Sequence, residues 1–358
     1  MSTRPRIRFD ADGRCNACIW SEKKKTLDWT PRLAELEELL DAHRRDDGGF
    51  DCVVPVSGGK DGSYVAHTLK HRFGMNPLAV TILPPLPTEI GNKNLQNFID
   101  SGYPHVSISP DTEAMRSLNK YGFTEMGFPY YGWLTAITVA PLEIAGRFDC
   151  ELVFYGEDGE VEYGGAPETE GSPYRSLEYL EKVYLEGGYE KVLQASALDP
   201  SKLRFFTFPN QADSRMRRLK RLNWSYFESW DPYRNYLVAK ESCGLEDAPE
   251  SNSGTFTNFA QNDQFLYSLH TYLMYLKFGF GRANQDACID IRRGALTREQ
   301  GIQLVNLYDG KFPEEHLELF LDYFGMTEDD FYSTLDRWAN KSLFEKRGHR
   351  HVPLFSMM

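Results

Sequence analysis

The sequence has few cysteines, no long apolar run and fewer positive than negative charges. Six cysteines among 358 residues are too few for a disulfide scaffold and are typical of a reducing compartment. No run of about 18 apolar residues occurs, which argues against a membrane span. The first residues lack the apolar core of a signal peptide. We therefore expect a cytoplasmic protein with no membrane partner.

The charge balance limits the classes of partner. Lys and Arg number 40 and Asp and Glu number 52, which gives a net charge of −12. A protein that binds duplex nucleic acid would be strongly basic, so we do not expect a nucleic-acid partner. The one dense basic run, residues 215–221, is typical of a solvated helix face, and the alternative is a surface for a phosphorylated or nucleotide-linked sugar or an acidic partner. An aromatic content of 14% excludes intrinsic disorder, and the length indicates two domains.

Apolar runs and amphipathic stretches alternate in the first part of the chain. The pattern predicts strands at 50–56, 77–83, 106–108 and 151–155, and helices at 30–40, 64–71, 92–101 and 133–145. Such alternation indicates an α/β fold with a doubly wound parallel sheet. Beyond about residue 210 the pattern is mainly helical, with helices expected at 262–278, 297–308 and 313–324.

The most informative motif is Ser57-Gly58-Gly59-Lys60-Asp61, between a buried strand and a helix. Its glycines allow a ligand to approach the backbone, and the helix N-terminus attracts an anion. The motif is neither a Walker loop nor GxGxxG. A glycine-rich turn without a ligand is the alternative. The preceding strand, Lys60 and Asp61 favour a nucleotide, with Mg²⁺ between Asp61 and the phosphates.

The longer run from Val54 to Ser63 resembles the SGGxDS signature of the PP-loop ATP pyrophosphatase superfamily. The resemblance implies a Rossmann-like fold that binds ATP and adenylates a substrate, releasing pyrophosphate. Gly62 stands where the signature has Ser, and Ser63 follows one place later as its substitute. The implied ATP-binding residues of the loop are Ser57, Gly58, Gly59, Lys60, Asp61, Gly62 and Ser63.

The whole chain is similar to the N-acetyl sugar amidotransferase (WbpG/PseA-like) family. The matching pieces are residues 4–18, the loop, 155–158 with 163–165, 254–258, 277–286, 291–299 and 308–313. The resemblance implies that ATP activates the acetamide oxygen of a sugar, free or nucleotide-linked. Ammonia from a separate glutaminase then displaces AMP and leaves an acetamidino group. The implied pathways make bacterial surface polysaccharides, such as the O-antigen of lipopolysaccharide, or nonulosonic acids (pseudaminic or legionaminic acid).

These inferences divide the chain into three parts. Residues 1–48 form an N-terminal segment with a cysteine pair and a helix, 49–208 the ATP-binding α/β domain, and 209–358 a mainly helical domain for substrate or partner.

Further site residues follow from the ends of strands and from charge. Gly156 and Glu157 end the fourth strand, where open α/β sheets bind ligands, so we expect them to bind ATP or its metal. The alternative is a solvated acidic turn. The expected catalytic residues are Lys60, Asp61 and Arg282. Arg282 suits a phosphate or carboxylate, or it forms an ion pair with Asp286. The expected substrate-binding residues are Asp158, Tyr163, Lys277, Arg282 and Asp286.

Cys15 and Cys18 have the spacing of half a tetrahedral zinc site. Cys243 or a second subunit would complete it, and a dithiol turn without metal is the alternative.

Two other functions remain open on the sequence. One is a tRNA-thiolating enzyme on the same scaffold, which the acidic charge disfavours. The other is a nucleotide-binding scaffold subunit that has lost turnover through Gly62.

Overall fold

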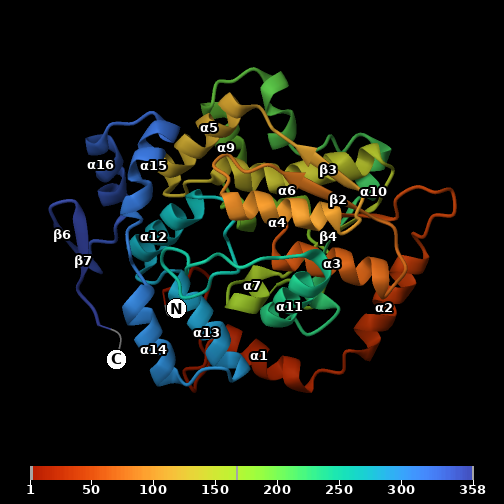
Figure 1. Cartoon of the computed structure of the whole chain (residues 1–358), viewed down its shortest axis with the longest axis horizontal. Coiled ribbons are helices and arrows are strands. Elements are labelled where there is room, and N and C mark those ends of the chain that lie inside the picture. The colour runs from red at the N-terminus through yellow and green to blue at the C-terminus, as the bar shows by residue number, and fades with distance from the viewer. Residues whose placement is uncertain (1–2, 167, 357–358) are drawn as a thin grey trace.

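The computed structural model describes residues 3–166 and 168–356. At its centre is a parallel sheet with the strand order β3-β2-β1-β4-β5 (Figure 1). Its strands are β1 (Cys52–Pro55), β2 (Pro77–Ile82), β3 (His105–Ile108), β4 (Leu152–Tyr155) and β5 (Lys220–Asn223). The predicted α/β fold with a doubly wound parallel sheet is thereby confirmed.

Helices cover both faces of the sheet because the buried strands present apolar side chains on both sides. On β1, Val53 packs in one core cluster with residues of α5 and α6, and Val54 packs in another with residues of α2 and α3. The α-helices of this part are α1 (Asn16–Thr26), α2 (Thr30–Asp41), α3 (Lys60–His71), α4 (Glu89–Asp100), α5 (Thr112–Tyr121), α6 (Tyr131–Arg147), α7 (Gly159–Tyr163), α8 (Leu177–Tyr179), α9 (Tyr189–Ala195) and α10 (Ser214–Arg218).

The later part of the chain is mainly helical, with a small hairpin near its end. Its elements are α11 (Pro232–Cys243), α12 (Leu266–Phe278), α13 (Arg282–Arg293), α14 (Arg298–Tyr308), α15 (Leu317–Phe324), α16 (Glu328–Trp338), β6 (Phe344–Arg347) and β7 (Arg350–Pro353). Short 3-10 or π turns complete the chain: η1 (Gly122–Met126), η2 (Leu180–Tyr184), η3 (Pro200–Phe206), η4 (Trp224–Tyr226) and η5 (Glu314–His316).

The structure differs from the predicted elements in several places. The basic run is not one helix face, because it splits into α10 and β5, and Arg221 is buried with its guanidinium 3.9 Å from the centre of the Tyr155 ring. β5 extends the sheet beyond residue 208, where the sequence predicted the α/β domain to end. The helix expected at 262–278 begins at Leu266, because residues 263–265 bond to the loop after β2.

The strand order places the ends of β1 and β4 side by side. The chain leaves β1 toward β2 on one side, and β4 and β5 lie on the other, so the connections diverge between β1 and β4. Open α/β sheets bind ligands at such a switch point, beyond the carboxyl ends of the strands. The loop after β1 and the residues after β4 both lie there.

None of the helices in the described part of the chain combines the length and the apolar character needed to cross a bilayer.

Candidate functional site

The loop after β1 is shaped for an anion. Gly59 is the N-cap of α3, and no side chain caps this helix, so its first N–H groups are free for a ligand. Gly58 has φ +78°, and a Cβ there would lie 2.4 Å from the backbone nitrogen of Leu95 in α4. Only glycine therefore allows the loop to turn this closely against α4.

A pocket of about 230 Å³ lies over this loop. In addition to the loop, its walls are formed by α4, the end of β4, α7, residues 259–263 and the starts of α12 and α13. The structure brings together eight of the predicted site residues in this pocket: Ser57, Gly59, Lys60, Asp61, Gly62, Glu157, Tyr163 and Arg282. We call it the phosphate-loop pocket.

Charged groups of opposite sign face each other in this pocket. Lys60 forms an ion pair with Asp61, whose Oδ1 also accepts a hydrogen bond of 3.2 Å from Asn235. The Tyr163 hydroxyl donates to Glu157 at 3.3 Å. Burial raises the pKa of Glu157, and the negative charge of Asp61 raises it further. Two carboxylates that repel each other beside an anion site suit a divalent cation.

Asp61 and Glu157 therefore fit a bound Mg²⁺. The described residues contain no cluster of three or more His, Cys, Asp or Glu side chains suited to a metal. Mg²⁺ usually takes only one or two protein carboxylates and completes its shell with water and substrate phosphates. The pair is thus consistent with an ion that arrives with a nucleotide.

Arg282 is the first residue of α13, and Gly279 to Gly281 form the turn before it. Its Nε lies 2.8 Å from Asp286 Oδ1. Asp286 is buried and also accepts hydrogen bonds from the hydroxyls of Thr255 (2.6 Å) and Thr257 (3.3 Å). The alternative ion pair is therefore present, and it holds Arg282 in the wall of the phosphate-loop pocket. Asp286 does not line this pocket; it positions Arg282.

Asp158 lies outside the phosphate-loop pocket. Its side chain is 2% exposed and forms an ion pair with the equally buried Arg175. It accepts from the hydroxyls of Thr169 (2.5 Å) and Tyr184 (2.9 Å), and it caps α7 through the N–H of Glu160. Every oxygen is thus used within the fold, which is why Asp158 has no group left for a substrate.

The structure also differs from the roles predicted for Ser63 and Gly156. Ser63 is fully buried and its Oγ has no hydrogen-bond partner among the described residues, so it faces the core beneath α3. It does not replace the missing Ser at position 62. Gly156 lies beside Asp61 and Trp230 behind the pocket, where a Cβ would lie 3.3 Å from Asp61 Cβ.

We expect Gly62→Ser to destabilise the protein by about 1–3 kcal/mol, without raising AMP formation. A Cβ at position 62 would lie 2.6 Å from the Pro55 carbonyl oxygen and 3.0 Å from Val56 Cα, and strand backbone cannot move aside. Urea unfolding measures the effect. Ser63→Ala is the matched control and should be neutral, because the lost hydroxyl has no partner. A stable and more active Gly62→Ser variant would contradict this expectation.

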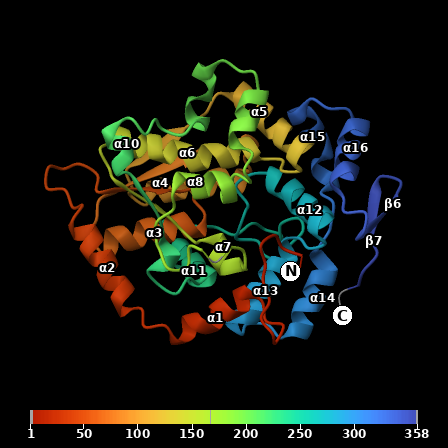
Figure 2. The same cartoon turned by 180° about the vertical axis from the view of Figure 1, so that it is seen from behind.

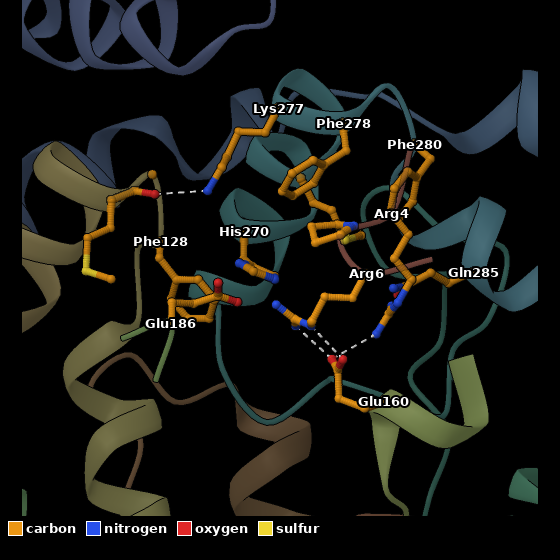
Figure 3. Close-up of a pocket in the computed structure, with 14 residues that line it drawn as sticks. Arg4, Arg6, Phe128, Glu160, Glu186, His270, Lys277, Phe278, Phe280 and Gln285 are labelled. Carbon is orange, nitrogen blue, oxygen red and sulfur yellow. Dashed lines mark hydrogen bonds and ion pairs between the residues drawn. The ribbon is translucent and has the colours of Figure 1, made fainter. Parts of the chain in front are cut away.

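Lys277 lies in a neighbouring pocket of about 270 Å³ (Figure 3). Its ammonium donates to the Met126 carbonyl at 2.9 Å. Across the pocket, Arg4 and Arg6 of the N-terminal segment both pair with Glu160 on α7. Glu160 and Tyr163 lie on the same short helix, so this ion-pair group holds the helix that carries Tyr163 to the phosphate loop.

The Cys15 and Cys18 sulfurs lie 3.5 Å apart at the start of α1. The hydrogen bond between the two thiols lowers the pKa of Cys15 to about 5 and raises that of Cys18. α1 lies beside α13 in both views (Figure 1 and Figure 2), and Arg292 of α13 also lowers the pKa of Cys15. Cys243 is buried in the core beside α3 and does not complete the pair. The zinc site stays a prediction.

Sequence reasoning missed the wall formed by residues 259–263 and Tyr267. Burial raises the pKa of Asp263 in this wall to about 6. The segment is held by bonds to the β2–α4 loop, from the Thr88 N–H to the Asp263 carbonyl at 3.2 Å and from the Phe265 N–H to the Leu86 carbonyl at 3.0 Å. The only signal in the sequence is its position directly after the family-like stretch 254–258.

The later part of the chain matches a known family. Residues 253–356 match the model of the C-terminal domain of WbpG-like lipopolysaccharide (LPS) biosynthesis proteins. This part of the chain is similar to a WbpG-like C-terminal domain. The predicted resemblance to the WbpG/PseA-like family is thereby confirmed. The match supports a biosynthetic, sugar-modifying role. The WbpG-like domain contributes residues 259–263, Tyr267 and Arg282 to the phosphate-loop pocket.

Two individual proteins are also similar to this chain. An uncharacterized protein of Methanocaldococcus jannaschii is 29% identical over 80 residues, which span 22% of this chain and 28% of that protein. The U34-tRNA thiolase NcsA from Methanococcus maripaludis, solved with its 4Fe–4S cluster, aligns with a TM-score of 0.36 and 11% identity. That alignment covers 78% of this chain and 79% of the thiolase, and similarity at this level carries no functional argument.

Proposed function

We propose that this protein uses ATP to activate the acetamide oxygen of an N-acetyl sugar and that ammonia then replaces AMP, leaving an acetamidino sugar. The observation that carries the proposal is the shared pocket. The loop at Ser57–Gly62, suited to phosphates, faces Arg282 of a domain similar to those of LPS biosynthesis proteins. A loop suited to phosphates and a domain similar to those of LPS biosynthesis proteins thus line the same pocket, which supports the proposal.

The proposed chemistry follows from the leaving group. An amide oxygen is a very poor leaving group, and transfer of AMP to it turns it into a good one. In this scheme the α3 N-terminus and Lys60 bind the phosphates, and Arg282 neutralises charge that develops on them. Asp61 and Glu157 would hold Mg²⁺, which neutralises phosphate charge. We further propose that a separate glutamine-hydrolysing partner supplies the ammonia.

Product analysis tests the proposal. The pure protein is incubated with Mg-ATP, ammonium and a panel of N-acetylated sugars, free and UDP-linked, and AMP and pyrophosphate are measured. Release of AMP that depends on both sugar and ammonium is expected. Release only with tRNA and a sulfur donor would identify a thiolating enzyme instead. ATP binding without AMP under all these conditions would identify a nucleotide-binding scaffold.

A further inference from the structure

A second pocket, of about 380 Å³, opens beside the phosphate-loop pocket. The two pockets share part of their walls, formed by Ala260, Gln261, Asn262, Tyr267 and Arg282. We call the second pocket the side pocket. Arg282 thus lies where the side pocket meets the phosphate-loop pocket.

The side pocket is lined mainly by hydroxyl and amide groups. They come from the segment before α12 and from α12 itself, and include Asn252, Ser253, Thr255, Ser268 and Thr271. Two positive side chains, Arg282 and Lys311, and two negative ones, Glu250 and Glu315, line it. A wall of this kind suits a ligand that is rich in hydroxyl and amide groups. The wall does not favour either sign of net charge on the ligand.

Gln264 is the unusual residue of this wall. Only 2% of its surface is exposed, and neither atom of its side-chain amide has a hydrogen-bond partner among the described residues. The Tyr267 hydroxyl lies near the amide, but the geometry between them is not that of a hydrogen bond. A buried amide without partners is destabilising by about 1–3 kcal/mol. In the wall of a pocket, an ordered water or a bound ligand can supply the missing bonds.

The backbone around Gln264 is fixed, but both atoms of its amide are fully buried, so the side chain must turn toward the side pocket to meet a ligand. Gln264 forms a β-bridge with Pro87 in the loop after β2. α12 begins two residues later, at Leu266.

We propose that the side pocket binds the acetamido sugar and that Gln264 selects it by its acetamide group. Gln264 Oε1 accepts the acetamide N–H, and Nε2 donates to an adjacent sugar hydroxyl. The acetamide oxygen then stays free to attack the α-phosphorus of ATP. That attack forms the oxygen–phosphorus bond, breaks the bond between the α- and β-phosphates and releases pyrophosphate. Only the adenylation step of this inference rests on the proposed function.

Gln264→Met tests the proposal, because methionine keeps the volume and removes both hydrogen-bonding atoms. We expect affinity for N-acetylglucosamine, N-acetylmannosamine and their UDP-linked forms to fall about tenfold. Saturation-transfer NMR on the acetyl methyl group measures this. ATP affinity should stay the same, and the melting temperature should stay equal or rise, because an unpartnered buried amide is lost. The exposed Gln303→Met in α14 is the control and should change none of these values.

Several outcomes would overturn the proposal. If the wild-type protein bound glucose and glucosamine with the same affinity as N-acetylglucosamine, it would not recognise the acetamide group. Lost ATP affinity in Gln264→Met with unchanged sugar signals would assign the side pocket to adenosine. A lower melting temperature together with weaker sugar binding would make Gln264 a structural residue. Gln264-dependent sugar binding without AMP formation would instead refute the proposed function and leave this inference standing.

Discussion

Asp61→Asn is expected to lower sugar-dependent AMP formation by about 100- to 1,000-fold, because the proposed mechanism uses this negative charge to hold Mg²⁺ against the phosphates. The fold should survive, because an asparagine at position 61 still accepts the hydrogen bond from Asn235. Initial rates of AMP release at several Mg²⁺ concentrations measure the effect. The variant should also need more Mg²⁺ for half-maximal rate.

The control for this variant is Asp100→Asn, an exposed carboxylate at the end of α4 that pairs with Gln96. It removes the same charge far from the phosphate loop and should leave AMP release unchanged. If Asp61→Asn retained the wild-type rate, the loop would not bind a metal–phosphate group through this carboxylate, and the proposed mechanism would fail.

Asp158→Asn is expected to lower the free energy of unfolding by about 3–5 kcal/mol, because it leaves the buried Arg175 without its counter-charge. Both side chains are almost fully buried, at 2% and 1% exposure. Urea unfolding of the variant measures the loss. The substituted amide also has only one oxygen to accept from Thr169 and Tyr184, which adds to the cost.

A double-mutant cycle separates the ion pair from the rest of this site. Arg175→Met alone should also destabilise, and the double variant Asp158→Asn/Arg175→Met should lose less than the two single losses combined, because neither charge is then left alone. Asp158→Asn with unchanged stability and raised KM for the sugar would restore the substrate-binding role expected from the sequence.

The phosphate loop was predictable because its determinants are local. A buried strand, two glycines and a helix start follow one another within about ten residues, and each is recognisable by its own residue types. Glu157 was predictable for a similar reason, since it follows the end of a clear strand. Patterns of this kind need no knowledge of how distant segments pack.

β5 and the split helix at 313–324 were not predictable in the same way. β5 is a charged stretch that becomes a strand because β4 offers it a partner and Tyr155 stacks on its Arg221. In the other segment, the 3-10 turn at 314–316 precedes α15. For β5, the tertiary partners decided the element against its local preference.

The sequence by itself determined the fold class, the glycine-rich loop between β1 and α3 and the family resemblance of the C-terminal region, because these depend on residue types at short spacing. Only the tertiary structure decided which residues reach the site. It brought Arg282 to a loop more than 200 positions earlier, placed Gln264 in the wall of the adjoining side pocket, and buried Asp158 and Ser63 inside the protein. It also showed that Gly62 has no room for the serine of the signature. Burial and close approach arise from packing between distant segments, which local sequence patterns do not record.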